Sequence, residues 1–267
     1  DAGFGNRLGG TFPDARKGSW QSFNDGNGIP SAFNRRDLAG KEKSALQATL
    51  GMIGFVDHSV GRIVDSLQDT GQIDNTIIVF TTDHGDMLGA QGLATKGIAT
   101  SYEELYNIPF ILRVPGMQAQ QKDTQTLVSM IDIAPTLLDL CGVAPLEAAQ
   151  GRSLRPVLEN TANPDDWRNA YAEFYGQRFV YTQRIVWYKN WKYVFSPGGI
   201  DELYNLEKDP YERVNLAEDP GHHDILIDMT TRMWQKMKEI GDDSLLNAHY
   251  ATLRTAPIGP YALNSPE

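Results

Sequence analysis

The residues best suited to chemistry stand together in the sequence Thr82-Asp83-His84-Gly85-Asp86. Asp83 offers a carboxylate oxygen and His84 an imidazole nitrogen, and both are common ligands of divalent metal ions. Adjacent side chains on a regular strand point to opposite faces, so the two can share an ion only where the strand ends and the backbone turns. Gly85 permits such a turn. The alternative is that Asp83 and Asp86 cap a turn while His84 bonds to the backbone.

The elements around this motif place it at the edge of a sheet. From residue 38 to residue 69, apolar residues recur at three- and four-residue steps, which predicts one long amphipathic helix that ends at Gly71. Residues 76–82 form a short run that is mostly β-branched or apolar, which predicts a buried strand. Because ligands of open α/β sheets bind beyond the carboxyl ends of the strands, this position favours a functional site.

The pattern of predicted elements changes along the chain. Helix and apolar strand alternate at first, and aromatic-rich strands with one amphipathic helix follow a linker at residues 163–166. The later predicted elements are strands at 110–114, 171–175, 179–187 and 191–195, and helices at 135–140, with Asp132 as its cap, and at 225–240. The sequence therefore predicts an α/β layer over residues 1–160 and a small antiparallel α+β subdomain over residues 161–267.

The composition is that of an ordinary globular protein and argues against several classes. The chain has 267 residues, of which 41% are hydrophobic and 22% are charged, so it can bury a substantial core. It contains no run of eighteen apolar residues, so no membrane span is predicted. A net charge of −10 argues against nucleic acid as a partner. The single cysteine, Cys141, excludes an internal disulfide and is expected to be a small buried residue.

A wider stretch around the motif carries a resemblance to a known family. Residues 74–89 read DNTIIVFTTDHGDMLG and closely resemble the signature of the sulfatases, a family of the alkaline-phosphatase superfamily. Many motifs in one order are more specific than any single motif. The further matching segments are residues 96–97, 102–104, 108–110, 113–116, 132–138, 151–154 and 201–210, with Glu212 and residues 215–216 behind them. The resemblance implies an alkaline-phosphatase-like layered sheet, of which this chain would be the C-terminal part, followed by the small subdomain.

The resemblance also assigns roles to individual residues. Asp83 and His84 match two ligands of the family's divalent cation, usually calcium, although the pair alone would favour zinc or manganese. Lys96 matches the lysine that binds the sulfate group, where its charge would neutralise sulfate oxygens as the ester bond breaks. Without the resemblance, Lys96 would be taken for a solvated surface lysine. Arg178 and Arg184 lie in a segment that lines the substrate cleft in some relatives, and alternating strand packing is the other explanation.

Part of the family's catalytic apparatus has no counterpart in this sequence. Sulfatases attack sulfur with a formylglycine made from the first residue of a Cys/Ser-x-Pro-x-Arg motif, and no such motif occurs here. The family's paired N-terminal aspartates are also without counterpart. The first thirty-five residues are rich in Gly, Asn, Asp and Pro and are expected to form a long loop. We therefore expect a missing N-terminal part of the same fold as a partner of this chain, and we expect the chain alone to be inactive.

The resemblance implies a sulfuric-ester hydrolase that acts on a sulfated small molecule or carbohydrate. Three alternatives remain: a phosphonate or phosphodiester hydrolase of the same superfamily, a non-catalytic binding protein, and a zinc phosphatase-like enzyme whose own ligand set is not visible. A Cys/Ser-x-Pro-x-Arg motif upstream would exclude the non-catalytic reading. The habit of the family implies a periplasmic or secreted location.

Overall fold

The computed structural model describes residues 42–92, 96, 101–117, 126–176, 182–197, 199–245, 256, 258 and 259. The chain divides into two units, Asp1–Lys122 and Asp123–Glu267, and each is described by itself. The domain boundary predicted at residue 160 refers to the domains of the complete fold. The division into these two units does not test that prediction. No helix in the described ranges is long and apolar enough to cross a membrane.

The described part of the first unit starts with the long helix α4 (Glu42–Asp69), which matches the predicted helix. Gly71 follows it with a φ of 68°, a left-handed conformation that ends helices and favours glycine. The short helix η2 (Ile73–Asn75) leads into strand β1 (Ile78–Thr81), which pairs antiparallel with β2 (Phe110–Arg113). Strand β1 is shorter than predicted and only half-buried. Among the described residues between the two strands in sequence are two further short helices, η3 (Ala90–Gly92) and α5 (Glu103–Tyr106).

Helix α4 carries large apolar side chains that are open to solvent. Leu50 and Ile53 are each 57% exposed, and Phe55 is 73% exposed. Leu46 is 47% exposed as well. An apolar helix face of this kind is normally covered in a folded protein.

The second unit opens with small helices connected by buried polar contacts. They are η4 (Met130–Asp132), α6 (Ile133–Leu140), α7 (Arg155–Leu158) and η5 (Pro164–Trp167). Asp132 precedes α6 as predicted, but its side chain makes no capping bond to that helix. Its carboxylate instead accepts hydrogen bonds from the backbone N–H groups of Ser129 and Arg152, each at 2.9 Å. The structure therefore places Asp132 at the predicted N-cap position, but its side chain joins two loops and does not cap α6. Cys141 is exposed, so its predicted burial was wrong.

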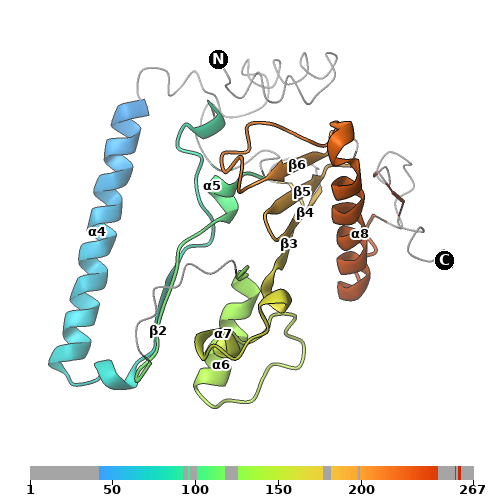
Figure 1. Ribbon diagram of the computed structural model, residues 1–267. Helices are drawn as coiled ribbons and strands as arrows, with labels where there is room; N and C mark the ends of the chain where they lie inside the picture. Colours follow the sequence, from blue (N-terminus) through green and yellow to red (C-terminus); the bar gives the residue numbers. More distant parts are fainter. Residues whose placement is uncertain are drawn as a thin grey trace. The chain divides into compact units, whose positions relative to one another are not determined.

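A four-stranded antiparallel sheet follows in the second unit (Figure 1). Its strands are β3 (Asn169–Phe174), β4 (Gln183–Tyr188), β5 (Trp191–Phe195) and β6 (Glu202–Asn205), in the order β3-β4-β5-β6. The short helix η6 (Pro220–His222) leads into α8 (His223–Ile240), which packs on β4 and β5. The antiparallel sheet with one covering helix confirms the predicted α+β subdomain, although β6 had not been predicted.

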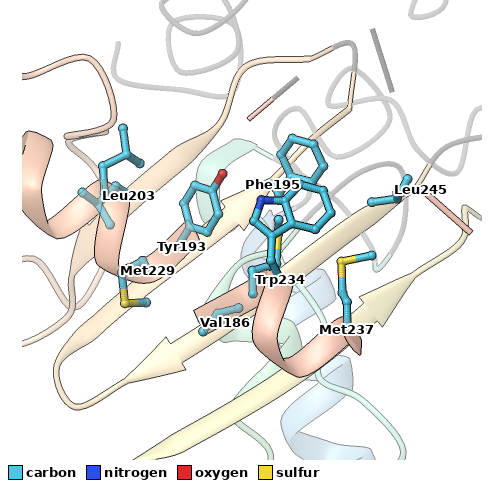
Figure 2. Close-up of a cluster of buried hydrophobic side chains, with 10 residues drawn as sticks. Val186, Tyr193, Phe195, Leu203, Met229, Trp234, Met237 and Leu245 are labelled. Atoms are coloured by element: carbon cyan, nitrogen blue, oxygen red, sulfur yellow. The ribbon is translucent and has the colours of Figure 1, made fainter. Parts of the chain in front are cut away.

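The core of this unit lies between α8 and the sheet (Figure 2). Predicted apolar positions of the helix face the sheet, and Met229, Met233 and Met237 are at most 1% exposed. They pack with Tyr193, Phe195 and other apolar side chains of the strands. A buried ion pair between Lys192 and Glu212, 2.8 Å long, lies in the same unit.

Candidate metal centre and sulfate-binding site

The chain turns immediately after β1, at the place where the motif begins. The hydroxyl of Thr82 donates to the backbone carbonyl of His84 at 3.2 Å, and the backbone N–H of His84 donates to Asp83 Oδ1 at 3.1 Å. These local bonds fold the backbone so that consecutive side chains no longer point to opposite faces. The turn that the sequence required for a shared site is therefore present.

Asp83 and His84 meet as predicted. Asp83 Oδ2 lies 3.3 Å from His84 Nε2, and the two side chains are 78% and 36% exposed. Burial opposes ionisation of Asp83, but the nearby His84 ring and hydrogen bonds from the backbone and Thr82 hold its pKa below the ordinary value. The carboxylate is therefore charged at neutral pH and available to bind a cation.

Lys96, which follows His84 by twelve positions in the chain, lies next to this pair. Its ammonium lies within hydrogen-bonding distance of His84 Nε2, and the side chain is partly buried. The structure thus brings together Asp83, His84 and Lys96, the three residues that were predicted to form one site.

The two donor atoms fit part of a divalent cation site. A cation about 2.3 Å from each of two atoms that are 3.3 Å apart would see them at about 90°, the angle between neighbouring ligands of an octahedral ion. Within the described residues, no third His, Cys, Asp or Glu completes a ligand cluster. Asp83 and His84 are therefore suited to supply two ligands of a divalent cation.

The turn rests on helix α5, a support that sequence reasoning missed. The N–H of Gly85 donates to the carbonyl of Leu105 at 2.9 Å. Met87, Tyr102 and Leu105 form a small buried cluster beside it. The signal was present in the sequence, because Tyr102, Leu105 and Tyr106 stand at the three- and four-residue steps of one helix face.

Part of the alternative explanation of the motif is also observed. Asp86 Oδ1 accepts from the N–H of Leu88 at 3.0 Å, so this carboxylate caps a turn. His84 Nδ1 contacts the carbonyl of its neighbour Gly85 at 2.7 Å. These local hydrogen bonds form in the same turn that brings Asp83 and His84 together. They therefore help to hold the two side chains close to each other.

The structure describes only one of the two arginines that were predicted to bind substrate. Arg178 lies outside the described residues. Arg184 is fully buried in β4, where its Nε donates to Asp242 Oδ2 at 2.7 Å. Its other nitrogens bond to Thr182, the Gln183 carbonyl, Ser244 and the Tyr175 hydroxyl. A guanidinium held in this way fits the strand-packing explanation, and a role in substrate binding stays a prediction.

Family models match two overlapping parts of the chain. One, described as Sulfatase, matches residues 15–143, and another, described as N-sulphoglucosamine sulphohydrolase, C-terminal, matches residues 95–239. The second match alone covers more than half of the chain and includes all of the four-stranded sheet. Both matches include Lys96, and the first includes Asp83 and His84.

Individual proteins agree with these matches. An N-acetylglucosamine-6-O-sulfatase of Bacteroides thetaiotaomicron is 34% identical over 198 residues, which are 69% of this chain and 35% of that protein. The solved structure of a 2-O GAG sulfatase matches with a TM-score of 0.67 and 31% identity, over 72% of this chain and 42% of that one. The phosphonate monoester hydrolase of Agrobacterium radiobacter matches with a TM-score of 0.61 and 28% identity, over 71% and 40%.

The chain therefore spans well under half the length of these relatives. The order of motifs, the matched family models and the shared fold agree with one another. The chain belongs to the sulfatase family of the alkaline-phosphatase superfamily.

Proposed function

We propose that the protein carrying this chain is a sulfuric-ester hydrolase and that this chain supplies one part of its active site. The observation that carries the proposal is the meeting of Asp83, His84 and Lys96 at the end of β1. A carboxylate and an imidazole suit a divalent cation, and an ammonium beside them suits a sulfate oxygen.

Each of the three residues has a distinct role in this proposal. Asp83 and His84 hold the cation, which we propose to be Ca²⁺ and which, when bound, stabilises negative charge on the sulfate group. Lys96 binds a sulfate oxygen and neutralises the charge that grows on it as the ester bond breaks. Its partly buried position strengthens this interaction, because less water competes for the ammonium.

We propose that the nucleophile lies outside this chain. The chain covers 35% of the N-acetylglucosamine-6-O-sulfatase, so most of that relative has no counterpart here. An N-terminal part of the same fold would carry the formylglycine and the remaining metal ligands. It would also cover the exposed apolar face of α4. On this proposal the 267-residue chain alone is inactive.

We propose a sulfated carbohydrate as the substrate class. Support comes from the names of relatives, one an N-acetylglucosamine-6-O-sulfatase and another a 2-O GAG sulfatase. The position of the sulfate on the sugar differs between these two, so the class is proposed without a position.

We also propose a periplasmic or secreted location, from the habit of the family, and cell fractionation would test it.

The second candidate is a phosphonate monoester hydrolase. It is favoured by the fold match to the enzyme of that name at a TM-score of 0.61. Asp83, His84 and Lys96 would serve a phosphonate as well as a sulfate, because both groups present charged oxygens. The two candidates therefore differ in the reacting group and share the site.

The test compares an aryl sulfate with an aryl phosphonate as substrates of the full-length protein. We expect the sulfate to have the larger kcat/KM, and Lys96→Ala to lower it about 100-fold or more, as loss of a charged transition-state contact does. Lys43→Ala is the matched control, since Lys43 is exposed on α4. A larger kcat/KM for the phosphonate would favour the second candidate. Turnover by the 267-residue chain alone would contradict the proposed N-terminal nucleophile.

A further inference from the structure

Gly85 brings the Asp83–His84 turn against the backbone of helix α5. Its N–H donates to the carbonyl of Leu105 at 2.9 Å. A β-carbon at position 85 would overlap the carbonyl oxygen of Glu104 and would lie 2.9 Å from the carbonyl carbon of the same residue. These neighbours are backbone atoms, so they cannot rotate away as a side chain would. Only glycine allows the turn to approach α5 this closely.

A second contact holds the turn against the same segment. Met87, two residues after Gly85, is 1% exposed and packs with Tyr102 and Leu105. The turn is therefore attached to α5 through one backbone hydrogen bond and one buried side chain. Its conformation depends on these contacts with a segment about twenty residues away in sequence.

The carbonyl of Gly85 then determines which nitrogen of His84 carries the proton. His84 Nδ1 lies 2.7 Å from this carbonyl oxygen, which can only accept a hydrogen bond. Nδ1 must therefore be the donor, and in the neutral ring Nε2 keeps its lone pair. Lys96 supports this assignment, because an ammonium only donates and it faces Nε2. The neutral ring of free histidine favours the opposite arrangement, with the proton on Nε2.

We propose that Gly85 is a positioning residue that fixes both the tautomer and the orientation of His84. Because the turn is held against α5, the Gly85 carbonyl binds Nδ1 and keeps the proton off Nε2, which lies 3.3 Å from Asp83 Oδ2, so that a cation could be shared by the two atoms. The positioning of His84 by Gly85 matters for metal binding through the proposed function, in which Asp83 and His84 share a cation. In metal sites, a bond from the second nitrogen of a histidine commonly sets the ligand in this way.

The first test measures calcium binding with a matched pair of glycine variants of the full-length protein. After treatment with a chelator, Gly85→Ala should bind Ca²⁺ about 10- to 100-fold more weakly than wild type by calorimetry. Gly61→Ala should stay within about twofold, since its β-carbon would meet nothing within 4 Å on exposed helix α4. An unchanged calcium affinity in a Gly85→Ala protein that keeps its thermal midpoint would overturn the proposal.

The second test needs no variant at position 85 to fold. Nitrogen-15 NMR of histidine-labelled wild-type protein at pH 8, free of metal, should show His84 with the proton on Nδ1. The His84 signals are assigned by their loss in His84→Gln. A proton on Nε2 would overturn the proposal. If the proton is on Nδ1 but wild-type protein binds no calcium, the positioning role stands and the proposed cation site fails.

Discussion

Arg184 and Asp242 form a buried ion pair, with Nε of the arginine 2.7 Å from Oδ2 of the aspartate. Arg184 lies on β4 and Asp242 follows the end of α8, so the pair ties the helix to the sheet. Burial opposes ionisation of Asp242, but hydrogen bonds from Arg184 and Ser244 hold its pKa below the ordinary value. This contact explains why Arg184, although polar, lies inside the second unit.

Removing one partner of this pair should strongly destabilise the unit. Asp242→Ala should lower the free energy of unfolding by about 3–5 kcal/mol, because it leaves a buried guanidinium without its counter-charge. Asp228→Ala, which breaks the more exposed pair with Arg232, should cost about 1 kcal/mol or less. Urea unfolding of the full-length protein followed by tryptophan fluorescence measures both. Equal losses for the two variants would contradict the structural role given to Arg184.

The carboxyl group of Asp201 should make the stability of the second unit depend on pH. Burial raises the pKa of Asp201 to about 6, against hydrogen bonds from Tyr193 and the Ser196 N–H that lower it. The folded state therefore keeps this proton to a higher pH than the unfolded state does. The stabilisation from this group is full below about pH 4 and is lost as the pH rises through about 6.

Asp201→Asn should remove this dependence, because an amide does not titrate. Its single oxygen replaces only one of the two carboxylate oxygens that accept from the Tyr193 hydroxyl and the Ser196 N–H, so the comparison is between the shapes of the pH profiles. The shift from 3.8 to about 6 corresponds to at most about 3 kcal/mol between pH 4 and pH 7. Thermal midpoints of wild type and variant across this range measure the effect. Parallel pH profiles for the two proteins would show that Asp201 does not titrate as expected.

Removal of the divalent cation should abolish activity of the full-length protein, because Asp83 and His84 are proposed to hold it. Asp83→Ala should weaken binding of Ca²⁺ by about 10-fold or more, since one charged ligand is lost. Asp86→Asn should bind calcium normally, because Asp86 faces the Leu88 N–H and an amide oxygen can replace it. Full activity after exhaustive chelation would refute the cation site.

The core between α8 and the sheet should be sensitive to loss of volume. Met233 is fully buried against the sheet, and Met233→Ala should lower the free energy of unfolding by about 2–5 kcal/mol. Gln235→Ala, at an exposed position of the same helix, should change it by less than about 0.5 kcal/mol. Urea midpoints of both variants test the packing shown in Figure 2.

The sequence by itself determined the local elements and the chemical character of the site. Apolar residues at helical spacing predicted α4 and α8, since burial of one face is a local pattern. The run before Thr82 predicted β1, and the family motifs predicted Asp83, His84 and Lys96 as site residues. These features are readable because residue type and spacing alone specify them.

Only the tertiary structure decided which polar residues work together across the chain. Arg184 is buried by Asp242, 58 residues away, and Asp132 bonds to Arg152 instead of capping its own helix. Strand β6 has little sequence signal of its own and forms because it pairs with β5. Gly85 positions the site through close approach to Glu104. Each of these outcomes depends on partners distant in sequence, and local periodicity carries no information about which distant groups will meet.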